Sequence, residues 1–319
     1  APSHEENTRK CAGVEAAVVY RAEPHDLALR LGINVPRERW LTSRDLGEHA
    51  GAGFRWVQFH TPPRVVLQEP AALRVHARAL RALLDPTGLR LVLHAPDDLS
   101  AGTPGADRAF TGLLEYAAEA GAELVAYHGL NFPDDHGPHA ETIRERALLE
   151  ERSMAQHLQQ AHTLGVTVAI ENLAPVFPGP RRMCHDPLAV RDLVRRLDSP
   201  AAGMLLDLGH LHVTSDITGS DPMQVAAACA PDVVLFHVHD NFGARRRPVD
   251  APGIDPLRLD LHLAPGAGTL PWPRLAGIAS GHTAPLLLEV QPQHRPALAA
   301  LQGATAALLT PATADRAAA

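Results

Sequence analysis

Apolar and polar residues follow two different periods along this chain from residue 31 onward. Short aliphatic and β-branched runs predict strands, and longer stretches with apolar residues every three or four positions predict helices. The predicted strands are residues 31–35, 54–60, 89–95, 124–129, 166–172, 204–208, 233–239 and 285–290. Strands that alternate strictly with helices predict one parallel sheet, either closed or doubly wound.

The clearest helical period lies in residues 140–164. One stripe of this segment carries Ile143, Leu148, Met154, Leu158 and Ala161, as expected for a helix that packs one face on a sheet. Residues 70–84, 107–120 and 187–197 show similar periods. The eight strands of this pattern favour a closed (β/α)₈ barrel, the TIM barrel, as a single α/β domain.

Polar residues with metal-binding side chains stand at the carboxyl ends of the last six predicted strands. In chain order they are His94, His128, Glu171, Asp207 with His210, His237 with His239 and Asp240, and Glu289. In (β/α)₈ barrels, the carboxyl ends of the strands form the active-site face. The pattern therefore predicts a barrel whose rim converges on a metal.

The barrel is expected to occupy residues 31–304. Residues 1–30 precede the first strand as an N-terminal extension, and residues 305–319 form an Ala-rich tail that is expected to fray. One connection is unusually long, from Asn241 to Pro271, and is rich in Pro, Arg and Gly. Loops of this length are usually functional, so we expect this one to fold over the barrel mouth.

Composition narrows the classes of function. Lys10 is the sole lysine, which excludes a Schiff-base lysine in the barrel and a P-loop. The net charge of −7 disfavours binding to nucleic acid. Three isolated cysteines indicate a reducing compartment. With no long apolar run to enter a membrane, the chain is expected to be soluble and cytoplasmic. The sequence is compatible with a homo-oligomer as well as with a monomer.

Four side chains from adjacent predicted strands form the core of the candidate site. They are Glu171, Asp207, His237 and Glu289. Three carboxylates and one imidazole suit Mn, Mg, Co or Zn. The alternative is that these charged strand ends simply face solvent, although the apolar run behind each one argues against it for all four together.

Further candidates surround this core. His94 and His128 contact metal or substrate, or else bond to loop backbone. Asp260 and His262 flank one residue, so in an extended loop both point the same way and form a possible ligand pair. His210 follows Asp207 by about one helical turn.

Two groups are candidates for contact with the substrate. His239 follows His237 by two residues, so both side chains can face inward. Arg245, Arg246 and Arg247 can grip a phosphate or carboxylate, or they form a solvated run of charge. Asp240 either orients a ligand histidine or bonds to the loop, and Trp272 is expected to pack rather than bind.

The ordered motifs resemble a known superfamily. HAP, YHG, IEN, LDLGH, HVHDN, D-x-HL-x-PG-x-G-x-x-PW and LLLE are similar to those of the xylose isomerase-like TIM barrels, which include sugar phosphate isomerases and epimerases and endonuclease IV. The resemblance spans residues 30–300. It implies a divalent metal on Glu171, Asp207, His237 and Glu289, with Glu171 and Glu289 as catalytic groups that shuttle protons on opposite faces of a sugar.

Endonuclease IV binds three zinc ions through nine residues. All nine positions are filled here, by His94, His128, Glu171, Asp207, His210, His237, Asp260, His262 and Glu289. The resemblance therefore implies one to three ions. The GEG of that family is GAG at residues 266–268, and the chain has no basic stripe to follow DNA, so both features weaken a DNA-repair assignment.

The expected function is a metal-dependent isomerase or epimerase of a sugar, sugar phosphate or cyclitol. The reaction would pass a proton between carboxylates through a metal-stabilised enediolate, and the substrate would be a small carbohydrate. The alternative enzyme is an endonuclease IV-like multinuclear zinc phosphoesterase. A barrel that only binds a ligand is disfavoured by the intact set of metal-binding residues.

Overall fold

The computed structural model describes residues 27–37, 41–133, 140–176, 179–244 and 258–310. Eight parallel strands form a closed barrel in the order of the chain, as the alternation predicts. The strands are β1 (Leu31–Asn34), β2 (Trp56–His60), β3 (Arg90–His94), β4 (Ala122–Tyr127), β5 (Thr167–Glu171), β6 (Ala202–Asp207), β7 (Val233–Val238) and β8 (Leu286–Leu288).

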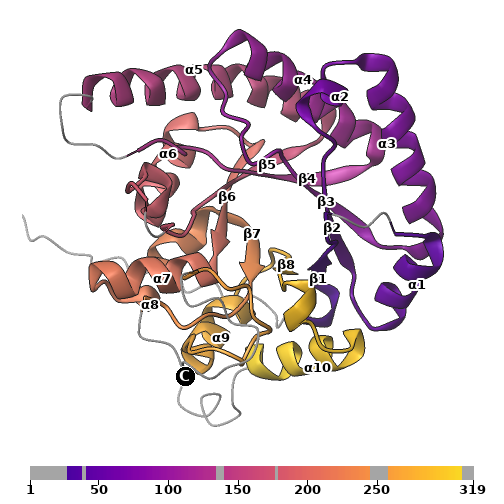
Figure 1. Cartoon of the computed structure of the whole chain (residues 1–319), viewed down its shortest axis with the longest axis vertical. Coiled ribbons are helices and arrows are strands. Elements are labelled where there is room, and N and C mark those ends of the chain that lie inside the picture. The colour runs from indigo at the N-terminus through magenta and orange to yellow at the C-terminus, as the bar shows by residue number, and fades with distance from the viewer. Residues whose placement is uncertain (1–26, 38–40, 134–139, 177–178, 245–257, 311–319) are drawn as a thin grey trace, which may run out of the picture.

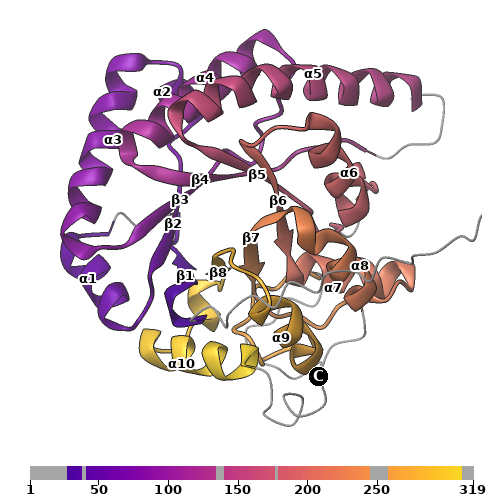
Figure 2. The same cartoon turned by 180° about the vertical axis from the view of Figure 1, so that it is seen from behind.

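Helices surround the barrel and connect successive strands (Figures 1 and 2). They are α1 (Ser43–Gly51), α2 (Arg64–Leu67), α3 (Pro70–Leu84), α4 (Pro104–Ala120), α5 (Ala140–Leu164), α6 (Pro187–Leu197), α7 (Leu208–Thr218), α8 (Pro222–Cys229), α9 (Trp272–Ser280) and α10 (Leu298–Leu309). Among the described residues, none of these helices has the length and apolarity needed to cross a membrane.

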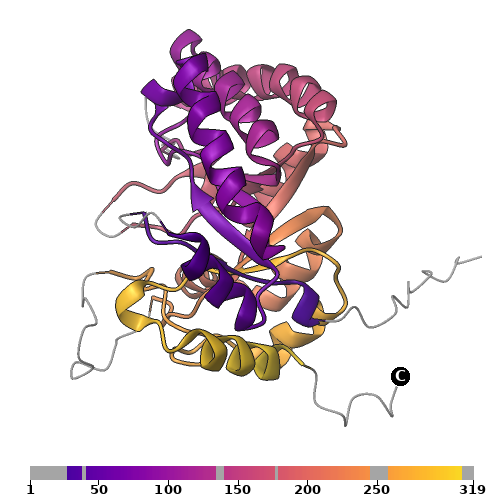
Figure 3. The ribbon, with the colours of Figure 1, turned by 90° about the vertical axis from the view of Figure 1, so that its right-hand side faces the viewer.

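Both ends of the barrel sequence meet on one side of the molecule. Strand β1 pairs with β8, and α10 lies beside the first described turn, Leu27–Leu29. Figure 3 shows the indigo and yellow segments together in side view. The chain therefore closes its own sheet, and no strand of the barrel presents an open edge.

The inside of the barrel follows the two-residue period of its strands. A small apolar cluster fills the interior, and its members from β2, β3, β5 and β7 include Trp56, Val92, Ala169 and Leu235. The larger apolar cluster lies between the strands and the helices. Because side chains on a strand alternate between faces, residues two positions after the inner cluster also point inward, at the carboxyl end of each strand.

Two expectations about the helices require correction. Leu148 is 50% exposed, although Met154, Leu158 and Ala161 of the predicted stripe are buried. The first half of α5 does pack on the core, through Ile143 and Ala147, but Leu148 lies about 140° from Ile143 around the helix and so faces away from it. At the other end of the chain, α10 continues to Leu309, which is fully buried. Residues 305–309 are therefore packed helix rather than frayed tail.

Candidate metal centre

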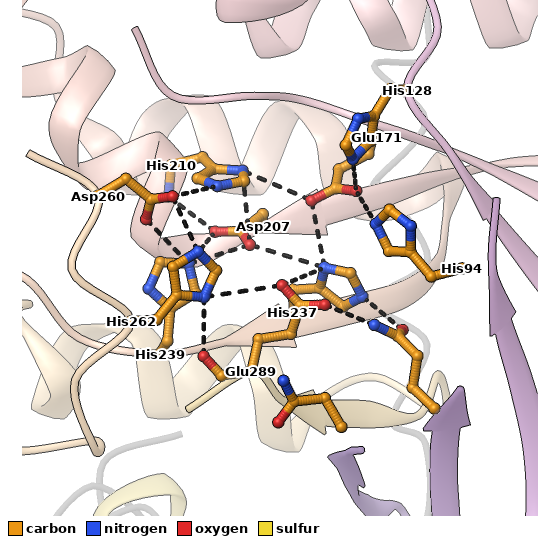
Figure 4. Close-up of polar contacts among 12 residues, drawn as sticks. His94, His128, Glu171, Asp207, His210, His237, His239, Asp260, His262 and Glu289 are labelled. Carbon is orange, nitrogen blue, oxygen red and sulfur yellow. Dashed lines mark hydrogen bonds and ion pairs between the residues drawn. The ribbon is translucent and has the colours of Figure 1, made fainter. Parts of the chain in front are cut away.

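The predicted site residues share one position in the barrel. His94, Glu171, Asp207, His237 and Glu289 each stand two residues after a member of the inner apolar cluster. Backbone geometry therefore directs all of them to the axis of the barrel, one layer above its apolar filling. Figure 4 shows these side chains converging from different strands.

The four core residues form a compact buried group. Nδ1 of His237 lies 3.2 Å from Oε1 of Glu171, 3.7 Å from Oδ2 of Asp207 and 3.4 Å from Oε2 of Glu289. One ligand atom from each residue fits within 4.8 Å of the others. Ligands about 2.1 Å from a common ion stand roughly 3 to 3.5 Å apart, so this spacing suits a single divalent cation.

A second group lies beside the first and includes the long loop after β7. It contains His210, His239, Asp260 and His262, again with ligand atoms within 4.8 Å. Oδ2 of Asp260 lies 2.8 Å from Nε2 of His262 and 3.4 Å from Nε2 of His210. The structure thus brings the predicted Asp260 and His262 pair to His210, next to the barrel axis.

A third group joins the first through a shared carboxylate. Oε2 of Glu171 lies 3.3 Å from Nε2 of His128 and 3.7 Å from Nε2 of His94, while its Oε1 faces His237. Glu171 can therefore serve two neighbouring cations at once. All nine residues that the resemblance implies as ligands belong to these three groups.

Three of the histidines are oriented in the same way by backbone. Nδ1 of His94, His210 and His262 each lies 2.8 Å from a carbonyl oxygen. Because a carbonyl only accepts, Nδ1 must donate, so Nε2 is the nitrogen that faces a carboxylate and is left to bind a cation. The acceptors are, in order, the carbonyls of Ala95, Asn172 and Glu289.

Asn172 fastens the ends of two neighbouring strands. Its side-chain amide donates to the carbonyl of Asp207 and accepts from the N–H of Asp207, at 3.1 and 2.9 Å. Asp207 in turn caps α7, because its Oδ1 accepts from the N–H of His210. Gly209 leaves room for His239, since a Cβ at residue 209 would lie 2.0 Å from that ring. The IEN and LDLGH motifs are therefore held together by hydrogen bonds.

Asp240 organises the long loop rather than a ligand histidine. Its buried carboxylate accepts from the N–H groups of Gly266 and Leu270 and from Nε1 of Trp272. Gly268 approaches closely, because a Cβ there would lie 2.3 Å from Oδ1 of Asp240. Trp272 is buried, as expected for a packing role. These contacts hold the loop that carries Asp260 and His262.

The charges of the site favour a cation. Burial alone would lower the pKa of His237, but the carboxylates of Glu289 and Glu171 outweigh it and raise this pKa to about 9. Burial likewise opposes a charged His262, and Asp260 raises its pKa to about 9. The buried carboxylates thus stabilise positive charge in the site.

Unpartnered buried atoms provide a second test of the fit. Oε2 of Glu171, Oδ1 of Asp260 and Nδ1 of His239 are inaccessible to solvent and have no hydrogen-bond partner among the described residues. Buried polar atoms are normally paired. Oxygen and nitrogen atoms that make no hydrogen bond are of the kind that coordinates a divalent metal.

A cavity of about 690 Å³ opens above the three groups. Its floor includes Glu171, Glu289 and the outer histidines, and one wall is the apolar segment Leu173–Val176. The lining also includes the polar residues Asn34, Arg37, His60, Arg258 and Gln291. A small molecule with hydroxyl groups can therefore reach the candidate metal ligands.

Of the four predicted substrate contacts, one differs from expectation and three cannot be placed. His239 is fully buried, with Nε2 3.1 Å from Asp207, and it does not line the cavity. The structure makes it a member of the second group. Arg245, Arg246 and Arg247 lie outside the described residues.

Sequence reasoning missed Gln58 and Asn172, which bond to the site without carrying charge. Both are fully buried. A signal for Gln58 existed, because it alternates with Trp56 and His60 on one predicted strand and so faces inward. Asn172 belongs to the IEN motif, but its contact with Asp207 spans 35 residues.

Glu150 on α5 supports the backbone that follows His128. The hydroxyl of Tyr127 donates to its Oε1, and the N–H of Leu130, a residue with φ of 54°, donates to its Oε2. Burial raises the pKa of Glu150 to about 7 from its ordinary 4.5, and the hydrogen bonds from Tyr127 and Leu130 and the positive charge of Arg146 only partly offset this. Glu150 is therefore a buried acid that resists ionisation.

This shift predicts a pH-dependent stability. Unfolded Glu150 releases its proton near pH 4.5 and folded Glu150 near pH 7, so stability falls as pH rises between these values. Relative to Glu150→Gln, the wild type should lose on the order of 3 kcal/mol between pH 4.5 and 7. Urea unfolding with chelator present measures this, with Glu151→Gln as control. Parallel profiles for wild type and Glu150→Gln would contradict the prediction.

Comparison with known proteins agrees with this geometry. Residues 47–307 match the model of the xylose isomerase-like TIM barrel, whereas no curated protein sequence matches the chain. A D-tagatose 3-epimerase-like protein has 18% identity and a TM-score of 0.65, with 88% of this chain and 96% of that chain covered. A xylose isomerase domain protein from Alicyclobacillus acidocaldarius has 21% identity and a TM-score of 0.62, with 88% and 99% covered.

A third solved structure, the IOLI protein with a binding zinc atom, has 16% identity and a TM-score of 0.61, with 88% of this chain and 96% of that chain covered. Identities this low show the shared fold alone. The family model, in contrast, matches most of the chain. The chain therefore belongs to the xylose isomerase-like TIM barrel family.

Proposed function

We propose that the protein is a metal-dependent isomerase or epimerase of a sugar, sugar phosphate or cyclitol. The observation that carries the proposal is the pair of glutamates on either side of His237, on the floor of the cavity. Glu171 and Glu289 come from β5 and from the end of β8, and their carboxylates approach His237 from different sides (Figure 4). The family and its epimerase-like structures support this class of reaction.

Each core residue has a distinct part in this proposal. Glu171, Asp207, His237 and Glu289 would hold a divalent cation, which supplies Lewis-acid polarisation of the oxygens of the substrate. One glutamate removes the proton next to the carbonyl and the other delivers a proton to the opposite face. Asp207 binds without transferring a proton, because its carboxylate also caps α7 and faces His239.

The alternative is a multinuclear zinc phosphoesterase similar to endonuclease IV. The second group favours it, because His210, Asp260 and His262 would be unnecessary for a mononuclear isomerase. The arginines at residues 245–247 stay a prediction in both cases, as a grip for an anionic group of the substrate.

Metal content separates the two enzymes. For the isomerase we expect about one Mn or Co per chain, unchanged by Asp260→Asn, because only the four core residues are needed. Elemental analysis of protein purified without chelator measures this number. About three Zn per chain, or nicking of abasic-site DNA at low enzyme concentration, would instead support the phosphoesterase.

A further inference from the structure

Gln58 is an uncharged side chain within this charged site. It is fully buried on β2. Its Nε2 donates to Oε1 of Glu289 at 2.5 Å, and its Oε1 lies 2.8 Å from Nε2 of His237. One amide therefore touches two candidate metal ligands from strands β7 and β8.

The chemistry of the amide decides which atom donates. An ionised carboxylate only accepts hydrogen bonds, so the nitrogen of Gln58 must face Glu289. The oxygen of Gln58 then faces His237 and can only accept. His237 must consequently carry a proton on Nε2. A neutral imidazole has a single proton, so Nδ1 is the nitrogen that gives up its proton to bind a cation.

Nδ1 of His237 points to the centre of the core group. Nδ1 of His237 is the atom within 3.2 to 3.7 Å of Glu171, Asp207 and Glu289. Because Oε1 of Glu289 is held by Gln58, its other oxygen, Oε2, is the one that faces His237. The two contacts of Gln58 thus orient two donors toward one point.

We propose that Gln58 is a positioning residue that selects Nδ1 of His237 as a metal ligand and turns Oε2 of Glu289 toward the same metal. This inference rests on the proposed metal-dependent function. Without Gln58, the proton of His237 is free to occupy Nδ1, where it competes with a cation, and the carboxylate of Glu289 is free to rotate.

Metal affinity tests the proposal without any substrate. Gln58→Met keeps the length of the side chain but removes both hydrogen bonds, and partners that orient ligands are worth roughly 10- to 100-fold in metal affinity. We expect calorimetry to show a 10- to 100-fold weaker Kd for Mn²⁺. Gln68→Met is the matched control, because Gln68 is exposed and its side chain bonds to the carbonyl of Gly105, away from the candidate metal ligands. Equal Mn²⁺ affinity in Gln58→Met and wild type would overturn the proposal.

The wild type provides a test that does not depend on the folding of a variant. In ¹⁵N-histidine-labelled protein loaded with Zn²⁺, NMR should show His237 protonated on Nε2, with the resonance assigned by its loss in His237→Asn. A proton on Nδ1, or a chain that binds neither Mn²⁺ nor Zn²⁺, would overturn the role of Gln58. Tight Mn²⁺ binding without turnover of any sugar would instead count against the isomerase, and it leaves the Gln58 result intact.

Discussion

Glu171→Gln and Glu289→Gln should each lower turnover by about 10³-fold or more while the barrel stays folded. A positioned acid or base contributes roughly 10² to 10⁴ in rate, and glutamine retains the shape of glutamate without its ability to take a proton. Each change also removes charge from the core group, in which His237 lies 3.2 and 3.4 Å from the two carboxylates. The loss should therefore appear in kcat.

Asp207→Asn separates proton transfer from metal binding. Asp207 is expected to bind the metal alone, so excess Mn²⁺ should restore much of the activity of Asp207→Asn and little of that of the glutamate variants. Turnover at several Mn²⁺ concentrations, with circular dichroism as a check on folding, makes the comparison. Near-normal turnover in both glutamate variants would exclude them as the proton-transfer pair.

Asp240→Ala should destabilise the folded protein by about 3 to 5 kcal/mol. The change leaves the N–H groups of Gly266 and Leu270 and Nε1 of Trp272 without their acceptor, and each unsatisfied buried donor costs about 1–3 kcal/mol before relaxation. Asp260 and His262 lie on the same loop, so metal binding should weaken as well.

Urea unfolding with chelator present measures the first effect. The carboxylate of Asp240 has four donors, because the N–H of Asn241 also bonds to it. Trp272→Phe removes one of the four and should cost only about 1 kcal/mol. Asp192→Ala, which changes an exposed carboxylate bonded to Arg191, should cost less than about 0.5 kcal/mol. A loss below 1 kcal/mol in Asp240→Ala would show that the loop is held by other contacts.

The barrel and the ends of its strands were predictable because both follow from local pattern. All eight predicted strands form, within a few residues of the expected bounds. Aliphatic runs specify strands, and the polar residues at their carboxyl ends lie at the same end of a parallel sheet. The inward direction of His94, Glu171 and His237 follows from the same two-residue period. Convergence on one axis then requires only closure of the sheet.

The contacts that orient these residues were not predictable, because they join distant parts of the chain. Gln58 meets Glu289 across 231 positions and His237 across 179, and neutral amides carry no signal of this role. The role of Asp240 depended on which residues of the long loop after β7 fold back against its carboxylate. The error over Leu148 has a different origin, since this residue lies about 140° from Ile143 around the helix and does not belong to the buried stripe.

The candidate ligands come from β3 through β8 and from the loop after β7, so they meet only when nearly the whole barrel has closed. An unfolded chain cannot reproduce such a group, and an ion that binds only the folded state adds RT ln(1 + [M]/Kd) to its stability. At a free metal concentration of 1,000 Kd this amounts to about 4 kcal/mol. The abundance of the folded protein in a cell would then follow the supply of metal, and starvation for metal would expose the chain to proteolysis.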